Sequence, residues 1–276
     1  MNPLVENPTS PFAMVRTILR HRSLIKQMIS REIIGRYRGS IFGLAWSFFN
    51  PLLMLAIYTL VFSVVFKARW GIETGESRAD FALILFVGLI FHAQFAEVLN
   101  RAPTLILTNT NFVKKVVFPI EILIVVCLGS AVFHAALSFL VLLAAFFLLK
   151  ETLYWTIIFA PLTFLPLIPL TLGLGWLLAS LGVYLRDIGQ IIGALTMMLL
   201  FLAPVFYPIT ALPEAYQSIL YLNPLTYPIQ ATRSVIIFGE MPNWLGLGAY
   251  TTISVLICYL GFWWFQKTRK GFADVV

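Results

Sequence analysis

Residues 30–66 have the sequence SREIIGRYRGSIFGLAWSFFNPLLMLAIYTLVFSVVF, in which a basic start gives way to a long apolar run. Arg31, Arg36 and Arg38 lie within the first nine positions, and no charged residue follows from position 41 to position 66. This run exceeds the roughly 20 apolar residues that a helix needs to cross a bilayer core. Cations before an apolar span mark the cytoplasmic side of a membrane helix. The stretch therefore predicts a first transmembrane span over residues 41–66, entered from the cytoplasm.

The composition of the whole chain is typical of an integral membrane protein. Of the 276 residues, 60% are hydrophobic and 11% are charged, whereas soluble domains carry roughly 25% charged residues. The length suits one membrane domain of about six spans and leaves no room for a separate soluble catalytic domain. The first ten residues, MNPLVENPTS, lack the basic-then-apolar order of a cleaved signal peptide. We therefore expect the first span to remain in the mature protein.

Hydropathy predicts an all-α polytopic membrane protein and divides the chain into three parts. These are a cytoplasmic N-terminus (1–40), a transmembrane domain (41–266) and a cytoplasmic tail (267–276). The six spans are expected at about residues 41–66, 80–97, 116–149, 153–184, 188–207 and 244–265. With this topology 14 Lys and Arg residues lie inside and 5 lie outside. Because such a bias favours the cytoplasmic side, both termini are expected in the cytoplasm.

Three segments outside the spans have patterns of their own. Residues 11–30 carry apolar side chains at helical spacing with basic residues on another side. They predict an amphipathic helix on the cytoplasmic membrane surface, with a helix packed on its own protein as the alternative. Residues 100–115 are basic, and their residue pattern favours a short ordered segment over an irregular loop. Residues 208–243 contain five prolines and apolar pieces too short to span, which predicts interfacial or re-entrant helices on the outer side.

Sequence motifs for nucleotide or metal chemistry are missing. No GxxxxGK[ST] loop occurs, and the chain is expected to bind no cofactor of its own. His21, His92 and His134 lack metal-ligand spacing, so no metal site is expected. His134 is expected at mid-membrane, bonded to a neighbouring helix, with a role in moving a proton or substrate as the alternative. The net charge of +7 comes from cations beside spans, which argues against a nucleic-acid partner.

Other classes of membrane protein fit the sequence poorly. The spans hold few of the carboxylates that a proton-driven transporter needs, and neither charge rings nor a carbonyl filter motif of an ion channel is visible. A membrane-embedded glycan or acyl transferase stays open as an alternative, with Asp187 or His134 as its candidate residues. Aromatic residues make up 15% of the chain. Most are expected in interfacial belts; the alternative is that some line a path and present flat faces to sugar rings, namely Tyr58, Phe62, Trp176 and Phe201.

The order of these features resembles one family of permeases. The segments that carry the likeness are REIIGRYRGSIFGLAWSFFNPLLMLAIYTLVFSVVF (31–66), TNTNFVKKVVFPIEIL (108–123), GVYLRDIGQIIGALTMMLLFLAPVFYP (182–208), NPLTYPIQATRSVIIFGEMP (223–242) and KTRKGFADVV (267–276). Together they resemble the membrane subunit of a type-2 ABC exporter. The closer likeness is to permeases that export O-antigen, capsular polysaccharide or teichoic acid. It covers nearly the whole chain, although no single segment is a strict signature.

The resemblance implies a mechanism and a set of partners. It implies a homodimer in the bacterial inner membrane, with a channel between its halves. It also implies two copies of a cytoplasmic ABC ATPase subunit, which would hold ATP and Mg²⁺. The substrate would be a polysaccharide on an undecaprenyl-pyrophosphate carrier, with O-antigen as the foremost candidate. A type-2 ABC permease for a drug or small lipid is the alternative within transport.

The resemblance also implies roles for particular residues. Coupling to the ATPase would involve Arg101, Thr108, Asn109, Asn111, Lys114 and Lys115. An outer gate would involve Pro208, Pro213, Asn223, Pro224 and Arg233. The lipid-linked pyrophosphate would meet Arg31, Arg36 and Arg38, because guanidinium groups bind phosphate bidentately. The alternative for these three arginines is topology together with attraction to anionic lipid headgroups.

Overall fold

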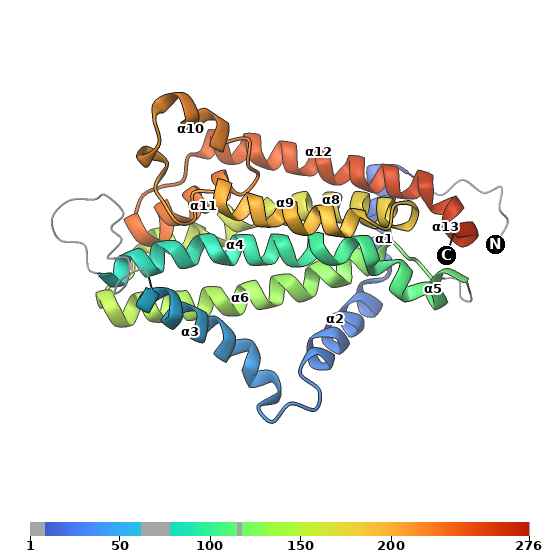
Figure 1. Cartoon of the computed structure of the whole chain (residues 1–276), viewed down its shortest axis with the longest axis horizontal. Coiled ribbons are helices and arrows are strands. Elements are labelled where there is room, and N and C mark those ends of the chain that lie inside the picture. The colour runs from blue at the N-terminus through green and yellow to red at the C-terminus, as the bar shows by residue number, and fades with distance from the viewer. Residues whose placement is uncertain (1–8, 62–77, 115–117, 276) are drawn as a thin grey trace.

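The computed structural model describes residues 9–61, 78–114 and 118–275, and these residues form helices and connecting turns without a β-strand. The molecule is an elongated bundle whose long helices run along its main axis (Figure 1). These helices are α4 (Arg78–Leu105), α6 (Ile122–Lys150), α8 (Leu167–Tyr184), α9 (Ile188–Leu202) and α12 (Trp244–Thr268). The all-α fold expected from the sequence is therefore confirmed.

Five described helical segments are long and apolar enough to cross a bilayer. They are Gly43–Val61, Asp80–Leu105, Ile122–Lys150, Trp155–Tyr184 and Trp244–Gly271, and the shorter apolar helix Ile188–Leu202 lies among them. The segment before α8 is divided into η4 (Trp155–Phe159) and α7 (Ala160–Phe164). Its prolines explain this division, since each removes a backbone donor. The predicted loop after the first span lies outside the described residues.

The second span is longer than hydropathy predicts. It was expected to end near residue 97, but α4 continues to Leu105 and contains Pro103. The polar residues of its last turns lie inside the protein, where they need no contact with lipid: Gln94 is 2% exposed, and Glu97 forms ion pairs with Arg36 and Arg101. Because hydropathy counts these residues against a span, it ends the helix too early.

The N-terminal segment forms two helices where one was expected. The segment divides at His21 into α1 (Pro11–Arg20) and α2 (Arg22–Arg36). Helix α2 runs obliquely away from the bundle, and α3 (Trp46–Tyr58) returns to it, so the two helices form a V (Figure 1). Gly39 and Gly43 in the tip have φ values of 83° and 50°, which side chains with a Cβ rarely adopt. They and η1 (Gly43–Ala45) delay the start of α3 beyond the predicted residue 41.

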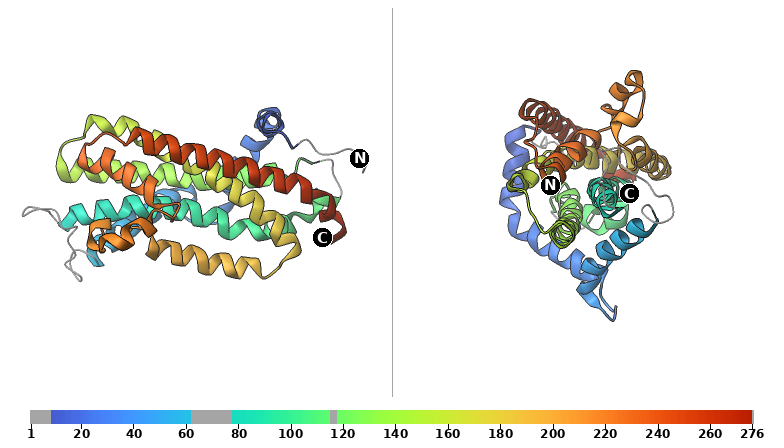
Figure 2. Two further views of the ribbon diagram at one scale, coloured as in Figure 1. Left: turned by 90° about the horizontal axis from the view of Figure 1, so that it is seen from above. Right: turned by 90° about the vertical axis from the view of Figure 1, so that its left-hand side faces the viewer.

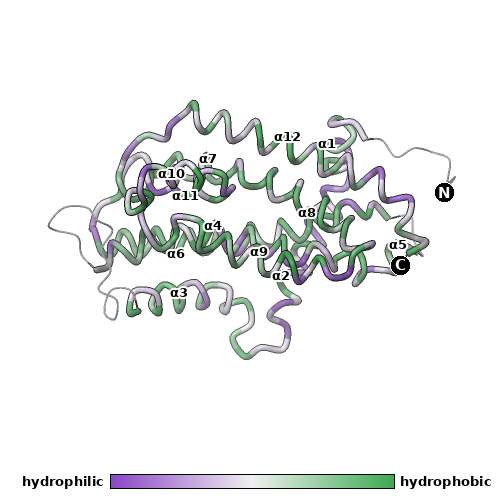
Figure 3. Tube along the Cα trace, turned by 45° about the horizontal axis from the view of Figure 1, so that its top comes forward, coloured by the Kyte–Doolittle hydropathy of each residue, from purple (hydrophilic) through white to green (hydrophobic). Residues whose placement is uncertain are grey.

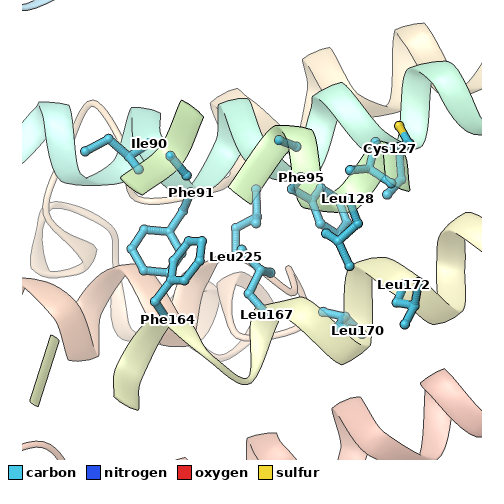
Figure 4. Close-up of a cluster of buried hydrophobic side chains, with 14 of the residues drawn as sticks. Ile90, Phe91, Phe95, Cys127, Leu128, Phe164, Leu167, Leu170, Leu172 and Leu225 are labelled. Carbon is cyan, nitrogen blue, oxygen red and sulfur yellow. The ribbon is translucent and has the colours of Figure 1, made fainter. Parts of the chain in front are cut away.

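Helix α8 packs between α12 and α4 (Figure 2), and α4 is the most buried of the described long helices. In the core, Phe91 of α4 lies edge-on against Phe164 of α7 with ring centroids 5.3 Å apart (Figure 4). Leu167 and Leu128 continue this buried cluster along the bundle axis (Figure 4). The core thus fixes α4, α6 and α8 relative to one another, and the V is attached to its side.

The two ends of the bundle differ in character. One end carries α1, the short helices η3 (Leu107–Asn109) and α5 (Thr110–Lys114), and the C-terminal η7 (Arg269–Gly271) and α13 (Phe272–Val275). Hydrophilic residues gather toward this end (Figure 3). The opposite end carries η5 (Ile209–Ala211), α10 (Glu214–Leu220), α11 (Thr226–Arg233) and η6 (Ser234–Phe238). These last elements are the short helices that the proline-rich segment predicts.

Candidate functional site

Two ion pairs join α2 to α4. Arg101 Nη1 lies 2.7 Å from Glu32 Oε1 and 3.4 Å from Glu97 Oε1, and Arg36 forms the second pair with Glu97. Each helix supplies one acid and one base four residues apart, so the charges alternate in sign along the row. We call these four residues the α2–α4 ladder. The side chains are 20–36% exposed, so each pair contributes modestly and the network holds the two helices in register.

His134, near the middle of α6, lies beside the ladder. Arg36 Nη1 donates to His134 Nδ1 at 3.4 Å, and His134 Nε2 lies 3.1 Å from the Tyr37 hydroxyl. Which of His134 and Tyr37 donates in this hydrogen bond depends on the imidazole nitrogen that carries the proton. Burial raises the pKa of Tyr37 above its ordinary value, so this hydroxyl stays protonated at neutral pH.

A cavity of about 410 Å³ separates α3 from the bundle next to these residues. We call it the α3 cavity. Its polar lining residues are Arg36, Tyr37, Ser47, Asn50, Tyr58, His92, His134 and Ser138. His92 Nε2 donates to the Thr196 carbonyl of α9 at 2.9 Å, which attaches α9 to α4 at the cavity. Hydroxyl, amide and imidazole groups thus dominate its polar surface, and such groups can exchange hydrogen bonds with a hydroxyl-rich ligand.

The structure does not gather the three predicted headgroup arginines. Arg31 and Arg36 lie five positions apart on α2, about 140° around the helix, so they face different surroundings. Arg36 is held by Glu97, whereas Arg31 and Arg38 are exposed. Neither of these two forms an ion pair with the described acidic residues. Arg31 and Arg38 are therefore the two with free guanidinium groups.

The four predicted path aromatics have different environments. Tyr58 lines the α3 cavity. Phe201, at the end of α9, is 56% exposed and stacks on Phe206 with centroids 5.6 Å apart. Trp176 is wholly buried and donates from Nε1 to the Glu121 carbonyl at 2.9 Å, so it packs in the core of this chain. Hydropathy cannot tell a core tryptophan from one on an open face. Phe62 lies outside the described residues.

Three of the predicted coupling residues, Thr108, Asn109 and Asn111, border a groove of about 700 Å³ between α2 and the short helices η3 and α5. We call it the α2–α5 groove. Its wall includes Arg31, Glu32, Thr108, Asn109 and Asn111, and the stacked rings of Phe112 and Phe118, 4.4 Å apart, border it. Since Glu32 belongs to both the groove and the ladder, the groove is linked directly to α4.

Side-chain hydrogen bonds fix the shape of the segment that contains η3. Asn109 Nδ2 donates to the Leu105 carbonyl at 2.8 Å, and Thr108 Oγ1 donates to the Thr104 carbonyl at 3.0 Å. Both bonds tie η3 back to the last turn of α4, while Asn111 is exposed. The side chain of Lys114 and all of Lys115 lie outside the described residues.

At the opposite end, the predicted gate residues mostly shape turns. Pro208 and Pro213 stand immediately before η5 and α10. Asn223 accepts from the Leu225 amide at 3.0 Å and donates to the Leu199 carbonyl at 3.0 Å. The Pro224 carbonyl accepts from the Tyr250 hydroxyl at 2.8 Å. These contacts attach the short helices to α9 and α12.

Arg233 lies in a loop-like segment, which suggests a position at the outer surface. In the structure it is fully buried. Its guanidinium donates to three backbone carbonyls: Ile84 at 2.9 Å, Val205 at 3.1 Å, and Pro204. Pro204 and Val205 follow the end of α9 and Ile84 lies on α4, so one side chain joins three segments. A buried charge is tolerated because the carbonyl oxygens replace water.

Sequence reasoning missed the partners Glu32, Tyr37 and Arg269. A signal for the first existed, since Glu32–Arg36 and Glu97–Arg101 share the same spacing of four residues. Arg269 donates from Nη1 to Glu121 Oε2 at 2.8 Å, joining the C-terminal end of α12 to the start of α6. These two residues lie 148 positions apart in the sequence, so no local sequence pattern predicts the pair.

Comparison with known proteins agrees with this architecture. The family model described as ABC-2 type transporter matches residues 23–237. An O-antigen export system permease protein, RfbA, of Myxococcus xanthus is 26% identical over 265 residues, covering 95% of this chain and 99% of the relative. RfbA of Klebsiella pneumoniae is 23% identical, covering 92% and 95%.

A third relative is named for the transport of polysialic acid. The polysialic acid transport protein KpsM of Escherichia coli is 22% identical over 238 residues, covering 86% of this chain and 90% of the relative. The residues that the family model matches include the ladder, α3, η3, α5, α10 and α11. Because the family model also covers well over half of the sequence, this chain belongs to the ABC-2 type transporter family.

Proposed function

We propose that this chain is the channel-forming permease of an ATP-driven exporter that moves lipid-linked polysaccharide out of the cytoplasm. The observation that carries the proposal is the nearly full-length similarity to proteins named for O-antigen export and polysialic acid transport. In this assignment the chain forms the membrane path and hydrolyses no ATP. A separate ATPase subunit binds ATP and Mg²⁺ and supplies the energy.

The assembly we infer is a homodimer with two ATPase subunits in the inner membrane of a bacterium, with both termini in the cytoplasm. The exposed face of helix α3 is an argument for a dimer, because a second copy of the chain could cover it. Most of the apolar side chains of α3 are exposed in a single chain: Phe48, Phe49, Leu52, Leu53, Met54 and Ile57. Helix α9 has a similar apolar face that includes Met197, Met198 and Phe201. A channel between two copies would lie along these faces.

The α2–α5 groove is the surface that we assign to the ATPase. A movement imposed on η3 or α5 reaches Glu32 at the groove, Arg101 and Glu97 on α4, and then Arg36 beside the α3 cavity. From Glu32 to Arg36 each step is an ion pair, so α2 and α4 would move together. ATP-driven motion at the groove would thereby change the shape of the α3 cavity.

The polysaccharide and its carrier would meet different groups. Hydroxyl, amide and aromatic side chains of the α3 cavity suit sugar rings, which slide past neutral polar walls without strong ionic binding. Arg38, whose guanidinium group is free of ion pairs and lies outside the α2–α5 groove, suits the pyrophosphate of an undecaprenyl-linked glycan. O-antigen is the foremost candidate for the glycan.

The decisive experiment is affinity purification of the tagged chain from its native host in a mild detergent. We expect a stoichiometric ATPase subunit to co-purify, and its ATP hydrolysis to depend on lipid-linked glycan. Asn111→Ala should weaken coupling of ATP hydrolysis to export at unchanged membrane level, with the exposed Gln190→Ala as the control. Purification without an ATPase, together with ATP-independent conversion of a lipid-linked sugar, would instead indicate a transferase.

A further inference from the structure

A second groove, on the side of α2 near α1 and α6, has no part in the proposed transport route. It has a volume of about 520 Å³. On α2 its lining residues recur at spacings of three and four, which makes them one continuous face of the helix: Arg22, Ile25, Lys26, Ile29, Ser30, Ile33 and Ile34. Ile18 and Leu19 of α1, Leu44 of η1 and Phe133 of α6 complete the wall.

The groove has an apolar floor and an open apolar rim. Ile25 and Ile33 form the floor and are 7% and 8% exposed. Leu19, Leu44 and Phe133 stand at the rim and are exposed. Ile29 packs against Gly129, where any Cβ would overlap it, so the α2–α6 contact beneath the groove is close. The lining offers few polar groups, so an occupant must be mainly hydrocarbon.

Two cations mark one end of this apolar groove. Arg22 and Lys26 are exposed and lie one helical turn apart on the lining face of α2. Neither forms an ion pair with any acidic residue that the structure describes, and the nearest acid in sequence, Glu32, is engaged by Arg101. Their charge is therefore available to an external anion.

We propose that this groove binds one anionic phospholipid of the surrounding bilayer. Its acyl chain lies along Ile25, Ile29 and Ile33, and its phosphate is bound by Arg22 and Lys26. Charge complementarity favours this occupant over a second protein helix, because a helix would need both a continuous apolar stripe and an acid at the same end. The bilayer supplies such an amphiphile at the place where α2 leaves the bundle.

The site has a structural consequence for α2. A lipid in the groove fills the space between the α1–α2 pair and α6 that protein side chains leave open. It would hold α2 at its angle to the bundle, and so hold the α2–α4 ladder, whose Glu32 and Arg36 lie toward the C-terminal end of the same helix. Anionic lipid is thereby expected to influence the ladder without touching it.

The test uses the full chain in nanodiscs of equal parts phosphatidylglycerol and phosphatidylethanolamine, with retained lipid counted by native mass spectrometry. The double variant R22Q/K26Q should reduce the affinity for phosphatidylglycerol about thirtyfold, since each of the two basic residues near a membrane contributes roughly 1 kcal/mol. The matched control R16Q/R20Q removes two exposed charges of α1 that do not line the groove. It should retain the lipid.

A second pair of variants keeps every charge. Ile34→Trp places a large ring at the groove, whereas Val15→Trp places the same ring on an exposed position of α1 outside it. Only Ile34→Trp should displace the phospholipid. This comparison remains decisive if R22Q/K26Q does not fold.

Three outcomes would overturn the proposal. Equal loss in R22Q/K26Q and R16Q/R20Q would mean general attraction to a charged surface. Equal retention of phosphatidylglycerol and phosphatidylethanolamine by the unmodified chain would mean that the groove does not select lipids by their charge. Displacement of phosphatidylglycerol by equimolar undecaprenyl phosphate would make the groove a carrier site. None of these outcomes depends on whether the chain exports polysaccharide, which the ATPase co-purification tests separately.

Discussion

Gly173 of α8 and Gly261 of α12 lie backbone against backbone where the two helices cross. A Cβ on Gly261 would overlap the backbone of Gly173, and a Cβ on Gly173 would overlap the backbone of Ile257 and Cys258. Small residues of this kind permit close packing of membrane helices, whose association depends on van der Waals contact. Helix α8 is thus positioned against α12 by two missing side chains.

Alanine at either glycine should separate α8 from α12. Gly173→Ala and Gly261→Ala are each expected to lower stability by about 1–3 kcal/mol, the range for overpacking a tight core. Thermal unfolding in detergent measures the effect. Gly248→Ala is the matched control, because this glycine is also on α12 and has open space around its Cβ position. Equal melting temperatures for all three variants would contradict the close crossing.

The two acidic residues of the α2–α4 ladder form different numbers of ion pairs. Glu97 pairs with two arginines, whereas Glu32 pairs with one. Glu97→Gln should therefore destabilise the chain more than Glu32→Gln, by about 1 kcal/mol for a partly exposed pair in a network. A double-mutant cycle of Arg36→Gln with Glu97→Gln measures their coupling.

The exposed and unpaired Glu240 provides the control for the ladder, and Glu240→Gln should leave the melting temperature unchanged. High salt should weaken the coupling between Arg36 and Glu97, because screening acts on charges that water reaches. A coupling energy of zero at low salt would show that the two charges do not interact in the folded protein.

Arg233 should be the least replaceable cation. Arg233→Gln leaves several buried carbonyls without donors, at about 1–3 kcal/mol for each, so we expect a strong loss of monodisperse protein in size-exclusion chromatography. Arg233→Lys keeps the charge but lacks the planar fork, and an intermediate yield is expected. Arg186→Gln, at an exposed position, should behave as the unmodified chain does. A normal yield for Arg233→Gln would exclude a supporting role.

The pair of Arg269 and Glu121 should hold the C-terminal segment on the start of α6. Both side chains are largely buried, at 15% and 8% exposure, so removing one charge leaves the other without its partner. Arg269→Gln is expected to destabilise by about 3–5 kcal/mol, and less when Glu121→Gln is added. Protease sensitivity of the C-terminal segment is the measurement, with the exposed Lys270→Gln as control. Greater damage in the double variant would contradict a paired role.

Hydropathy and charge predict the general fold because a bilayer imposes strong rules on length and composition. The long spans and the short proline-rich helices follow from those rules. The end of α4 does not, since Glu97 and Arg101 are polar residues that satisfy one another inside the protein. The start of α3 was also missed, because the strained turn at Gly39 and Gly43 depends on conformations that hydropathy does not record.

The candidate site was less accessible from sequence. The importance of residues 31–38 and 100–115 was evident from their charge, but not which side chain faces which. Arg36 and Arg31 have the same chemistry and sit on the same helix, yet one is paired and the other is free. Trp176 and Arg233 show the same difficulty, since their burial depends on segments distant in the chain. Such choices are made by three-dimensional packing.

The alternation of charge in the α2–α4 ladder has an electrical consequence. Moving one elementary charge through the membrane potential changes the energy by about 2.3 kcal/mol per 100 mV. The ladder contains two carboxylates and two guanidinium groups, so as a unit it carries no net charge. A joint displacement of α2 and α4 therefore does almost no work against the field. The joint movement of α2 and α4 would therefore be insensitive to the membrane voltage. Depolarisation of the cell would neither drive nor block this movement.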